Sequence, residues 1–107
     1  MPEIPPARIT IDRYTVSCLP EDHPELAHFT VDVEYRGRGR WAVARYKRCY
    51  DADGREDWEP IPSERTDEWL DRHRHDLDAA LDIARRVAPT LTVNGHTVAD
   101  VLRGNDA

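Results

Sequence analysis

Cysteine is rare in this sequence, which has only Cys18 and Cys49 among its 107 residues. Small secreted domains often replace a large hydrophobic core with several disulfides, and two cysteines are too few for such a scaffold. Long apolar runs are missing as well, since no stretch approaches the ~18 residues that suggest a membrane-spanning helix. A chain of this length suffices for one hydrophobic core. We therefore expect a single domain in which both thiols are free and buried.

Aromatic residues are also few, with three tryptophans, four tyrosines and one phenylalanine, whereas 34% of the residues are charged. The core must therefore be small, and much of the chain must lie at the surface. The first eight residues contain three prolines and no hydrophobic block, so they do not have the pattern of a signal peptide. We expect a cytoplasmic protein with a flexible lead at residues 1–7, one domain at 8–103 and a flexible tail at 104–107.

The clearest strand signal runs from Phe29 to Tyr35, where apolar and polar residues alternate strictly. This period of two is the pattern of a strand with one buried face. Another strand is predicted between Arg8 and Leu19. Its first half has isoleucines at odd positions and its second half has apolar residues at even positions, so we expect a bend near Asp12 and Arg13.

The segment Arg36-Gly37-Arg38-Gly39-Arg40 predicts a tight hairpin turn, because glycine tolerates positive φ. The pattern allows two registers for the strand that follows. A three-residue loop places Trp41 opposite Tyr35, whereas a two-residue loop turns Ala42 and the alternate residues after it inward. We favour the three-residue loop, because it buries Trp41.

The strand after this turn is expected to reach from Arg40 to Tyr50. The favoured register leaves Arg45 and Lys47 on the buried phase, so the second half of the strand should change phase. Asp51-Ala52-Asp53-Gly54 then predicts a second turn, followed by a short strand that carries Trp58.

The residues from Ser63 to Pro89 have the periodicity of one long amphipathic helix. Ser63 and Thr66 are candidate N-caps, and Pro89 cannot continue the helix. The predicted buried face consists of Trp69, Leu70, His73, Leu77, Ala80, Leu81, Ile83, Ala84, Val87 and Ala88.

A short strand is expected at Leu91 to Val93, and Asn94-Gly95 after it predicts a turn. Thr97 and Asp100 have the spacing of a capping box, which predicts a short final helix. These elements together predict an α+β domain with a three- to four-stranded antiparallel sheet packed against one long helix in the C-terminal half, plus a short C-terminal strand and helix.

Three segments, Tyr35–Val43, Pro62–Leu70 and Leu91–Asp100, carry a resemblance that spans most of the chain. In these segments the sequence resembles short uncharacterised proteins of high-GC Gram-positive bacteria and their phages. No activity is attached to that group, so the resemblance implies a shared fold and no particular chemistry.

The segment from Asp51 to Gly54 places carboxylates around a glycine, as calcium-binding loops do. Its spacing excludes an EF-hand, because with Gly54 as the turn glycine the first ligand falls on Cys49 and the twelfth on Pro60. Neither residue is a carboxylate. We therefore expect a hairpin turn here, with no metal and no cofactor.

His73 and His75 point about 200° apart around a helix, so they do not form a chelating pair. His73 falls on the apolar face with Asp76 three residues later, and this leaves two interpretations: a tuned acid–base pair, or a core histidine with one hydrogen-bond partner. The second is the commoner arrangement. Neither cysteine has a base or an oxyanion site that the sequence identifies, so we expect no enzymatic activity.

Residues 36–48 carry a local charge of +6 and contain no acid, whereas the rest of the chain totals −12. Arginine, tryptophan and tyrosine dominate the energetics of interfaces, so this basic segment predicts a partner-binding surface. The candidate binding residues are Arg36, Arg38, Arg40, Trp41, Arg45, Tyr46 and Arg48.

The leading functional hypothesis is therefore a small non-enzymatic accessory protein that binds a protein partner through this hairpin. The alternative is a nucleic-acid-binding module, in which the arginines contact phosphates and the aromatic rings stack on bases. A purely structural interpretation also remains, in which Arg45 or Lys47 is neutralised by an acidic residue across the hairpin.

Overall fold

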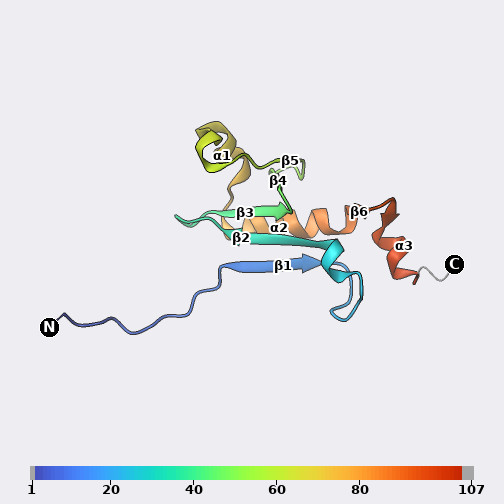
Figure 1. Ribbon diagram of the computed structural model, residues 1–107, viewed down its shortest axis with the longest axis horizontal. Helices are drawn as coiled ribbons and strands as arrows, with labels where there is room; N and C mark the ends of the chain where they lie inside the picture. The colour runs from blue at the N-terminus through green and yellow to red at the C-terminus, as the bar shows by residue number, and fades with distance from the viewer. Residues whose placement is uncertain (1, 105–107) are drawn as a thin grey trace.

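The computed structural model describes residues 2–104, which form a five-stranded antiparallel sheet with its helices packed around it (Figure 1). The sheet consists, in chain order and in spatial order, of β1 (Arg13–Ser17), β2 (Thr30–Tyr35), β3 (Trp41–Arg45), β4 (Arg48–Tyr50) and β5 (Glu56–Trp58). The longer helices are α1 (Asp67–His73) and α2 (Leu77–Val87). The remaining elements are β6 (Thr92–Val93), β7 (His96–Thr97), α3 (Val98–Leu102) and the 3-10 turns η1 (Leu26–Phe29), η2 (Pro62–Glu64) and η3 (Ala88–Thr90).

This architecture confirms the predicted α+β class, with five strands in place of three or four. Within residues 2–104, none of the helices has the length and apolar character needed to cross a bilayer. Residue 1 of the predicted lead and residues 105–107 of the predicted tail lie outside the described residues.

The favoured register of the first hairpin is confirmed, because Tyr35 pairs with Trp41. The Arg36 amide donates to the Arg40 carbonyl at 2.8 Å, which closes a three-residue loop. All three loop residues have positive φ, at 91° for Gly37, 56° for Arg38 and 73° for Gly39. The two glycines adopt this conformation without a steric penalty, so the loop depends on them.

The single strand predicted from Arg40 to Tyr50 is wrong, because the chain turns back at Tyr46 and Lys47. Arg45 pairs with Arg48, and the two strands are β3 and β4. Tyr46 has a φ of 54°, in the left-handed region where glycine and asparagine are the usual residues. The turn contains neither of them, so no turn signal marks it in the sequence. The expected change of phase takes place at this turn.

The helix predicted from Ser63 to Pro89 is not continuous. It is divided into α1, which begins after its N-cap Thr66, and α2, which begins after its N-cap Asp76. The residues between the helices are extended, and His75 forms an antiparallel bridge with Trp41 through N–O hydrogen bonds of 2.7 and 2.9 Å. These two bonds satisfy the backbone groups of Trp41 on the edge of β3 that the short strand β4 does not reach.

The two helices pack on opposite faces of the sheet, which is why a single straight helix is excluded. Side chains alternate between the faces of a strand. Val43 accordingly contacts the main core with Ile83 of α2, while Ala42 and Ala44 contact Trp69 of α1. Seven of the ten residues predicted on the buried helical face are buried, and Leu70, Leu77 and Leu81 are half-buried.

The C-terminal elements follow their sequence signals closely. Asn94 and Gly95 have φ values of 52° and 81°, as a two-residue hairpin turn requires, and they join β6 to β7. The predicted capping box is confirmed, because Thr97 Oγ1 accepts from the Asp100 amide at 3.1 Å and the Asp100 carboxylate accepts from the Thr97 amide at 2.9 Å.

The core assignment of α2 is testable by truncating one buried side chain. Ile83 is only 2% exposed, so Ile83→Ala should lower the free energy of unfolding by about 2 to 5 kcal/mol in urea titrations. Arg85→Ala, on the exposed face of the same helix, should change it by less than about 1 kcal/mol. Equal losses at the two positions would contradict this orientation of the helix.

Candidate functional site

The predicted binding residues other than Trp41 fall into two groups, one at each end of β3. Residues 36–40, here called the glycine loop, precede β3, and residues 45–48, here called the basic turn, run from the last residue of β3 to the first residue of β4. A strand rises about 3.3 Å per residue, so the five-residue β3 keeps the groups roughly 13 to 16 Å apart. A small ligand therefore contacts only one of the two groups, whereas a macromolecular partner is large enough to span both.

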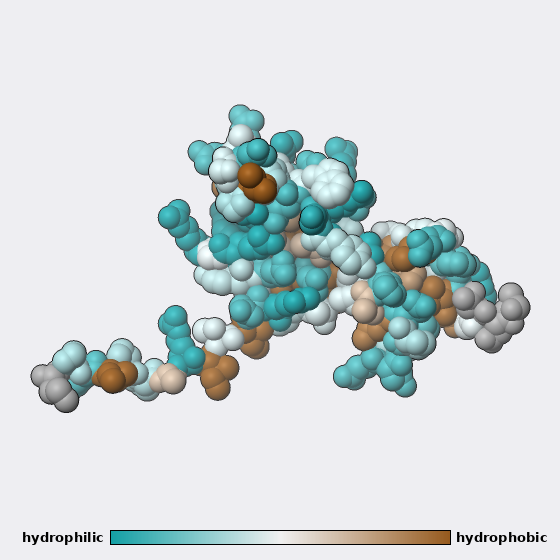
Figure 2. All heavy atoms as spheres, viewed as in Figure 1, coloured by the Kyte–Doolittle hydropathy of each residue, from teal (hydrophilic) through white to brown (hydrophobic). Residues whose placement is uncertain are grey.

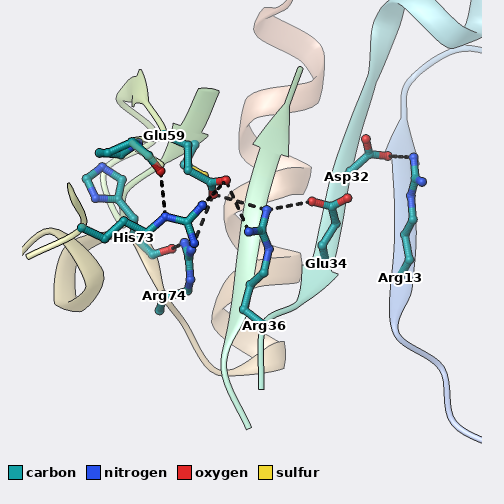
Figure 3. Close-up of polar contacts among 10 residues, drawn as sticks. Arg13, Asp32, Glu34, Arg36, Glu59, His73 and Arg74 are labelled. Atoms are coloured by element: carbon teal, nitrogen blue, oxygen red, sulfur yellow. Dashed lines mark hydrogen bonds and ion pairs between the residues drawn. The ribbon is translucent and has the colours of Figure 1, made fainter. Parts of the chain in front are cut away.

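The glycine loop contributes less charge to the surface than the sequence suggests. Arg36 holds both oxygens of Glu59 at 3.3 Å and also contacts Glu34 at 3.1 Å (Figure 3). Trp41 is buried, and its ring packs against those of Tyr14 and Tyr35 at centroid distances of 5.6 and 5.1 Å. Arg36 is therefore already paired within the fold, and Trp41 is buried in the core.

The other two arginines of the glycine loop remain exposed to solvent. Arg38 and Arg40 form no ion pair with any residue in the described part of the chain. The Gly39 amide donates to the Tyr35 hydroxyl at 3.0 Å, which holds the tip of the loop. The loop therefore presents two cations and no exposed aromatic side chain of its own.

The basic turn combines cations with exposed aromatic rings. The Arg45 guanidinium donates to the His28 carbonyl at 2.8 Å and lies 5.2 Å from the centroid of the Tyr46 ring. Arg48 forms an ion pair with Glu56. Within the described residues, neither Arg45 nor Lys47 forms the ion pair across the hairpin that the sequence suggested, and Arg48 is instead the paired residue of the turn.

Trp58 of β5 lies directly beside this turn, because its backbone pairs with Arg48. The Arg48 guanidinium lies 5.0 Å from the centroid of the Trp58 ring, a cation–π contact. Tyr46 is 77% exposed and Trp58 is 60% exposed. A hollow of about 480 Å³ joins them, lined by Arg45, Tyr46, Lys47, Arg48, Glu56, Trp58 and Thr92.

Four lining residues, Lys47, Glu56, Trp58 and Thr92, are absent from the sequence-based candidates. Trp58 carries a strand signal only, because tryptophan is usually buried and nothing in the pattern marks it as exposed. Its place in the site follows from the unpredicted turn at Tyr46, because the turn pairs β4 with β3, and β5 then pairs with β4 beside the turn.

A second cluster surrounds the carboxylate of Glu59, which is 16% exposed (Figure 3). The Cys49 thiol donates to Glu59 Oε1 at 2.8 Å. Arg65 contacts the other oxygen at 3.1 Å, and Arg74 lies 3.5 Å from Oε1. Together with Arg36, three arginines and a thiol therefore converge on one carboxylate.

The pKa shifts in this cluster agree with the ion-pair network that its contacts form. Burial acts to raise the pKa of Glu59, but the Cys49 hydrogen bond and the three arginines outweigh it, so this pKa is lowered. Burial and the neighbouring carboxylate raise the pKa of Cys49 to about 12. A thiol that stays protonated at neutral pH is a poor nucleophile. Glu59 and Cys49 therefore hold β4 to the segment after β5.

His73 and His75 are both buried, His73 as the last residue of α1 and His75 in the extended segment between the two helices. His73 stacks on Trp69 with ring centroids 4.3 Å apart, and its Nδ1 lies 2.8 Å from the Trp69 carbonyl oxygen. Asp76 accepts the Ala79 amide at 2.8 Å as the N-cap of α2. These contacts favour the core interpretation of His73 over an acid–base pair. The ring of His75 lies 3.1 Å from the Tyr50 carbonyl oxygen, and burial lowers its pKa.

Within residues 2–104, no group of three or more His, Cys, Asp or Glu side chains is placed to hold a metal ion. The segment from Asp51 to Gly54 forms the β4–β5 turn, as predicted, with the Gly54 amide donating to the Asp51 carbonyl at 2.9 Å. The Asp51 carboxylate is also used within the turn, since it accepts the amides of Asp53 and Arg55 at 2.9 and 3.0 Å.

The two free thiols should differ in reactivity. Cys49 is buried as predicted, but Cys18 is exposed, contrary to expectation, because it lies just beyond the end of β1. Iodoacetamide should therefore add one alkyl group to the native protein, at Cys18, and a second only after denaturation. Equal labelling of both cysteines in the native protein, seen by peptide mass spectrometry, would refute the buried position of Cys49.

The Glu59 cluster should make stability depend on pH. Because the pKa of Glu59 is lowered by folding, the ionised carboxylate stabilises the fold above its unfolded-state pKa, and this stabilisation is lost as the pH falls through the folded-state value. Glu59→Gln should thus lower the free energy of unfolding most near neutral pH, and less below pH ~4. Glu64→Gln, at an exposed carboxylate, serves as the control, and a pH-independent loss at Glu59 would contradict this account.

The chain was compared with protein-family models, with curated proteins and with solved structures. No family model matches it, and no curated protein and no solved structure matches it either.

Proposed function

We propose that this protein is a non-enzymatic binding protein that engages an acidic protein partner through the basic turn and β5. The observation that carries this proposal is the exposure of two large aromatic side chains, Tyr46 and Trp58, around one hollow. Together with their arginines they supply the residue types that dominate binding energy at protein interfaces.

The energetic argument rests on the area that these rings leave in water. A tyrosine or tryptophan side chain buries about 150 to 250 Å² when it is fully covered. At about 25 cal/mol per Å², covering the exposed parts of Tyr46 and Trp58 contributes on the order of 2 to 4 kcal/mol each, before the costs of association. Two such side chains suffice as the centre of a small interface.

The charge of the same surface favours an acidic partner. Arg45, Lys47 and Arg48 line the hollow, whereas Glu56 is its only acidic lining residue. Arg45 lies against the Tyr46 ring and Arg48 against the Trp58 ring. Arg48 is already paired with Glu56, so Arg45 and Lys47 are the cations of the turn that form no ion pair within the described residues and can meet a partner's carboxylates. The net charge of −6 of the whole chain opposes long-range attraction to any polyanion, so these cations act on an acidic partner at short range.

Single-stranded nucleic acid is the second candidate for the same surface. Exposed aromatic rings beside cations are the arrangement on which unpaired bases stack. The two candidates differ in salt dependence, because phosphate contacts release counterions and so lose affinity steeply as salt is raised.

The proposal is tested with the double variant Tyr46→Ala/Trp58→Ala. Both side chains are exposed, so the free energy of unfolding of the variant should stay within about 1 kcal/mol of the wild-type value. Immobilised protein is incubated with a nuclease-treated cell lysate, and the captured proteins are quantified by mass spectrometry. A specific partner should be captured by the wild type and lost from the double variant.

The matched control is Arg38→Ala/Arg40→Ala, which removes two exposed arginines from the glycine loop and should retain the partner. Capture that is equal for the wild type and both variants would refute the proposed surface. Capture from an untreated lysate that is lost from the nuclease-treated lysate, together with tight binding of an oligothymidine at low salt only, would assign the surface to nucleic acid instead.

A further inference from the structure

The first residues that the structure describes form an extended arm, residues 2–12, that runs away from the folded body (Figure 1). Its three isoleucines lie in water, with Ile4 91% exposed, Ile9 98% exposed and Ile11 63% exposed, and Figure 2 shows hydrophobic side chains along this arm. The arm increases the radius of gyration to 16.7 Å, where a compact chain of this length has about 13 Å. A surface-exposed apolar segment of this kind has no partner within the described chain.

The arm continues an edge strand whose outer side is unpaired. β1 pairs only with β2, and the one backbone hydrogen bond between the arm and the described body joins the Tyr35 amide to the Asp12 carbonyl at 2.8 Å. Asp12 therefore directs its backbone groups toward β2. Because this direction alternates along an extended strand, Ile9 and Ile11 direct their amides and carbonyls toward the open edge.

The sequence of this edge is its own antiparallel complement. Two identical edges can pair antiparallel around a two-fold axis normal to the sheet. In such a pair one residue lies directly opposite the same residue of the other copy, and the axis passes midway between the two. With the axis at Thr10, Arg8 faces Asp12 and Ile9 faces Ile11. Opposite charges and apolar pairs in facing positions are the contacts that stabilise antiparallel strands.

Other registers do not combine these pairs. An axis at Asp12 or at Arg13 places two like charges directly opposite each other, which is destabilising. An axis at Ile11 places Arg13 opposite Ile9 and leaves Asp12 facing Thr10. Pro5 and Pro6 have no amide proton, so a ladder centred on Thr10 ends at these prolines.

We propose that the arm is a dimerisation strand and that its partner is a second copy of this chain, paired through residues 8–12 around Thr10. The dimer pairs the two arms with each other, so that β1 of each copy continues into the shared ladder, and it brings Ile9 and Ile11 of both copies together on one face. A second copy is the occupant that the arm itself specifies, because it supplies the facing residue for both charges and both isoleucines. This proposal is independent of the binding function assigned to the basic turn.

Charge reversal tests the register directly, since Arg8 and Asp12 are exposed and outside the folded body. Sedimentation equilibrium should show a dimer for the wild type at tens of micromolar. Arg8→Asp alone, or Asp12→Arg alone, sets like charges opposite each other at two places in the dimer and should weaken dimerisation by about tenfold or more. The chain that carries both substitutions should dimerise like the wild type.

A mixture of the two single variants gives the sharpest result, because every charged pair is again complementary between unlike chains. The mixture should form a heterodimer although neither variant dimerises well alone. A wild type that stays monomeric throughout this range would overturn the proposal, as would single variants that dimerise as tightly as the wild type.

Cross-linking tests which residue lies on the axis. In this register Thr10 faces its own copy in a non-hydrogen-bonded pair, with Cα atoms about 4.5 Å apart, a separation that a disulfide spans. In a Cys18→Ser background, Thr10→Cys should form a disulfide-linked dimer under mild oxidation. Thr15→Cys, on the same edge, faces residue 5 of the other copy and should remain unlinked. Equal cross-linking of the two variants, or none at Thr10→Cys, would contradict the register.

Discussion

The fold depends on the passage of the chain from one face of the sheet to the other at residues 74–76. β3 has buried side chains on both of its faces, so each face needs a covering helix, and the sequence supplies both helices in succession. The crossing residues leave the helical conformation and would lose hydrogen bonds, but the pairing of His75 with Trp41 restores two of them. That pairing is available only because β4 is short and leaves this part of β3 unpaired.

Side-chain contacts in the Glu59 cluster also stabilise this crossing. Arg74 is buried, donates to the His73 carbonyl at 3.0 Å and lies 5.2 Å from the centroid of the Trp69 ring, while its other end faces Glu59. A buried guanidinium is costly unless charges and hydrogen bonds compensate it. Glu59 supplies that compensation, and it also fixes Arg36 at the start of the glycine loop.

Sequence reasoning was most successful where one local rule decides the outcome. The alternation from Phe29 to Tyr35 and the spacing of Thr97 and Asp100 each depend on neighbouring residues, and both predictions are confirmed. It failed where tertiary contacts override a local pattern. The helical periodicity through residues 74–76 is real, but the bridge to Trp41 and the cap at Asp76 favour an interruption that no glycine or proline announces.

The candidate site shows the same limit. The basic residues at 36–48 were identified from charge alone, which says nothing about their pairing partners. Arg36 is neutralised by Glu59, a residue 23 positions away, and Trp41 is buried in the core. Trp58 becomes part of the surface only through the unpredicted turn at Tyr46, where a tyrosine adopts a backbone conformation that the residue type does not suggest.

The position of β5 at the sheet edge also has a consequence for local opening. All three residues of this strand are exposed, and it pairs with the three-residue β4 alone, so few buried contacts oppose its separation from the sheet. Segments of this kind open with a smaller free energy than the global unfolding of the domain. Trp58 therefore lies on a weakly held edge of the sheet. A ligand that covers Trp58 binds only the closed form of this edge, so its binding raises the free energy of the local opening. Occupancy of the surface and amide protection of β4 and β5 are thus thermodynamically linked.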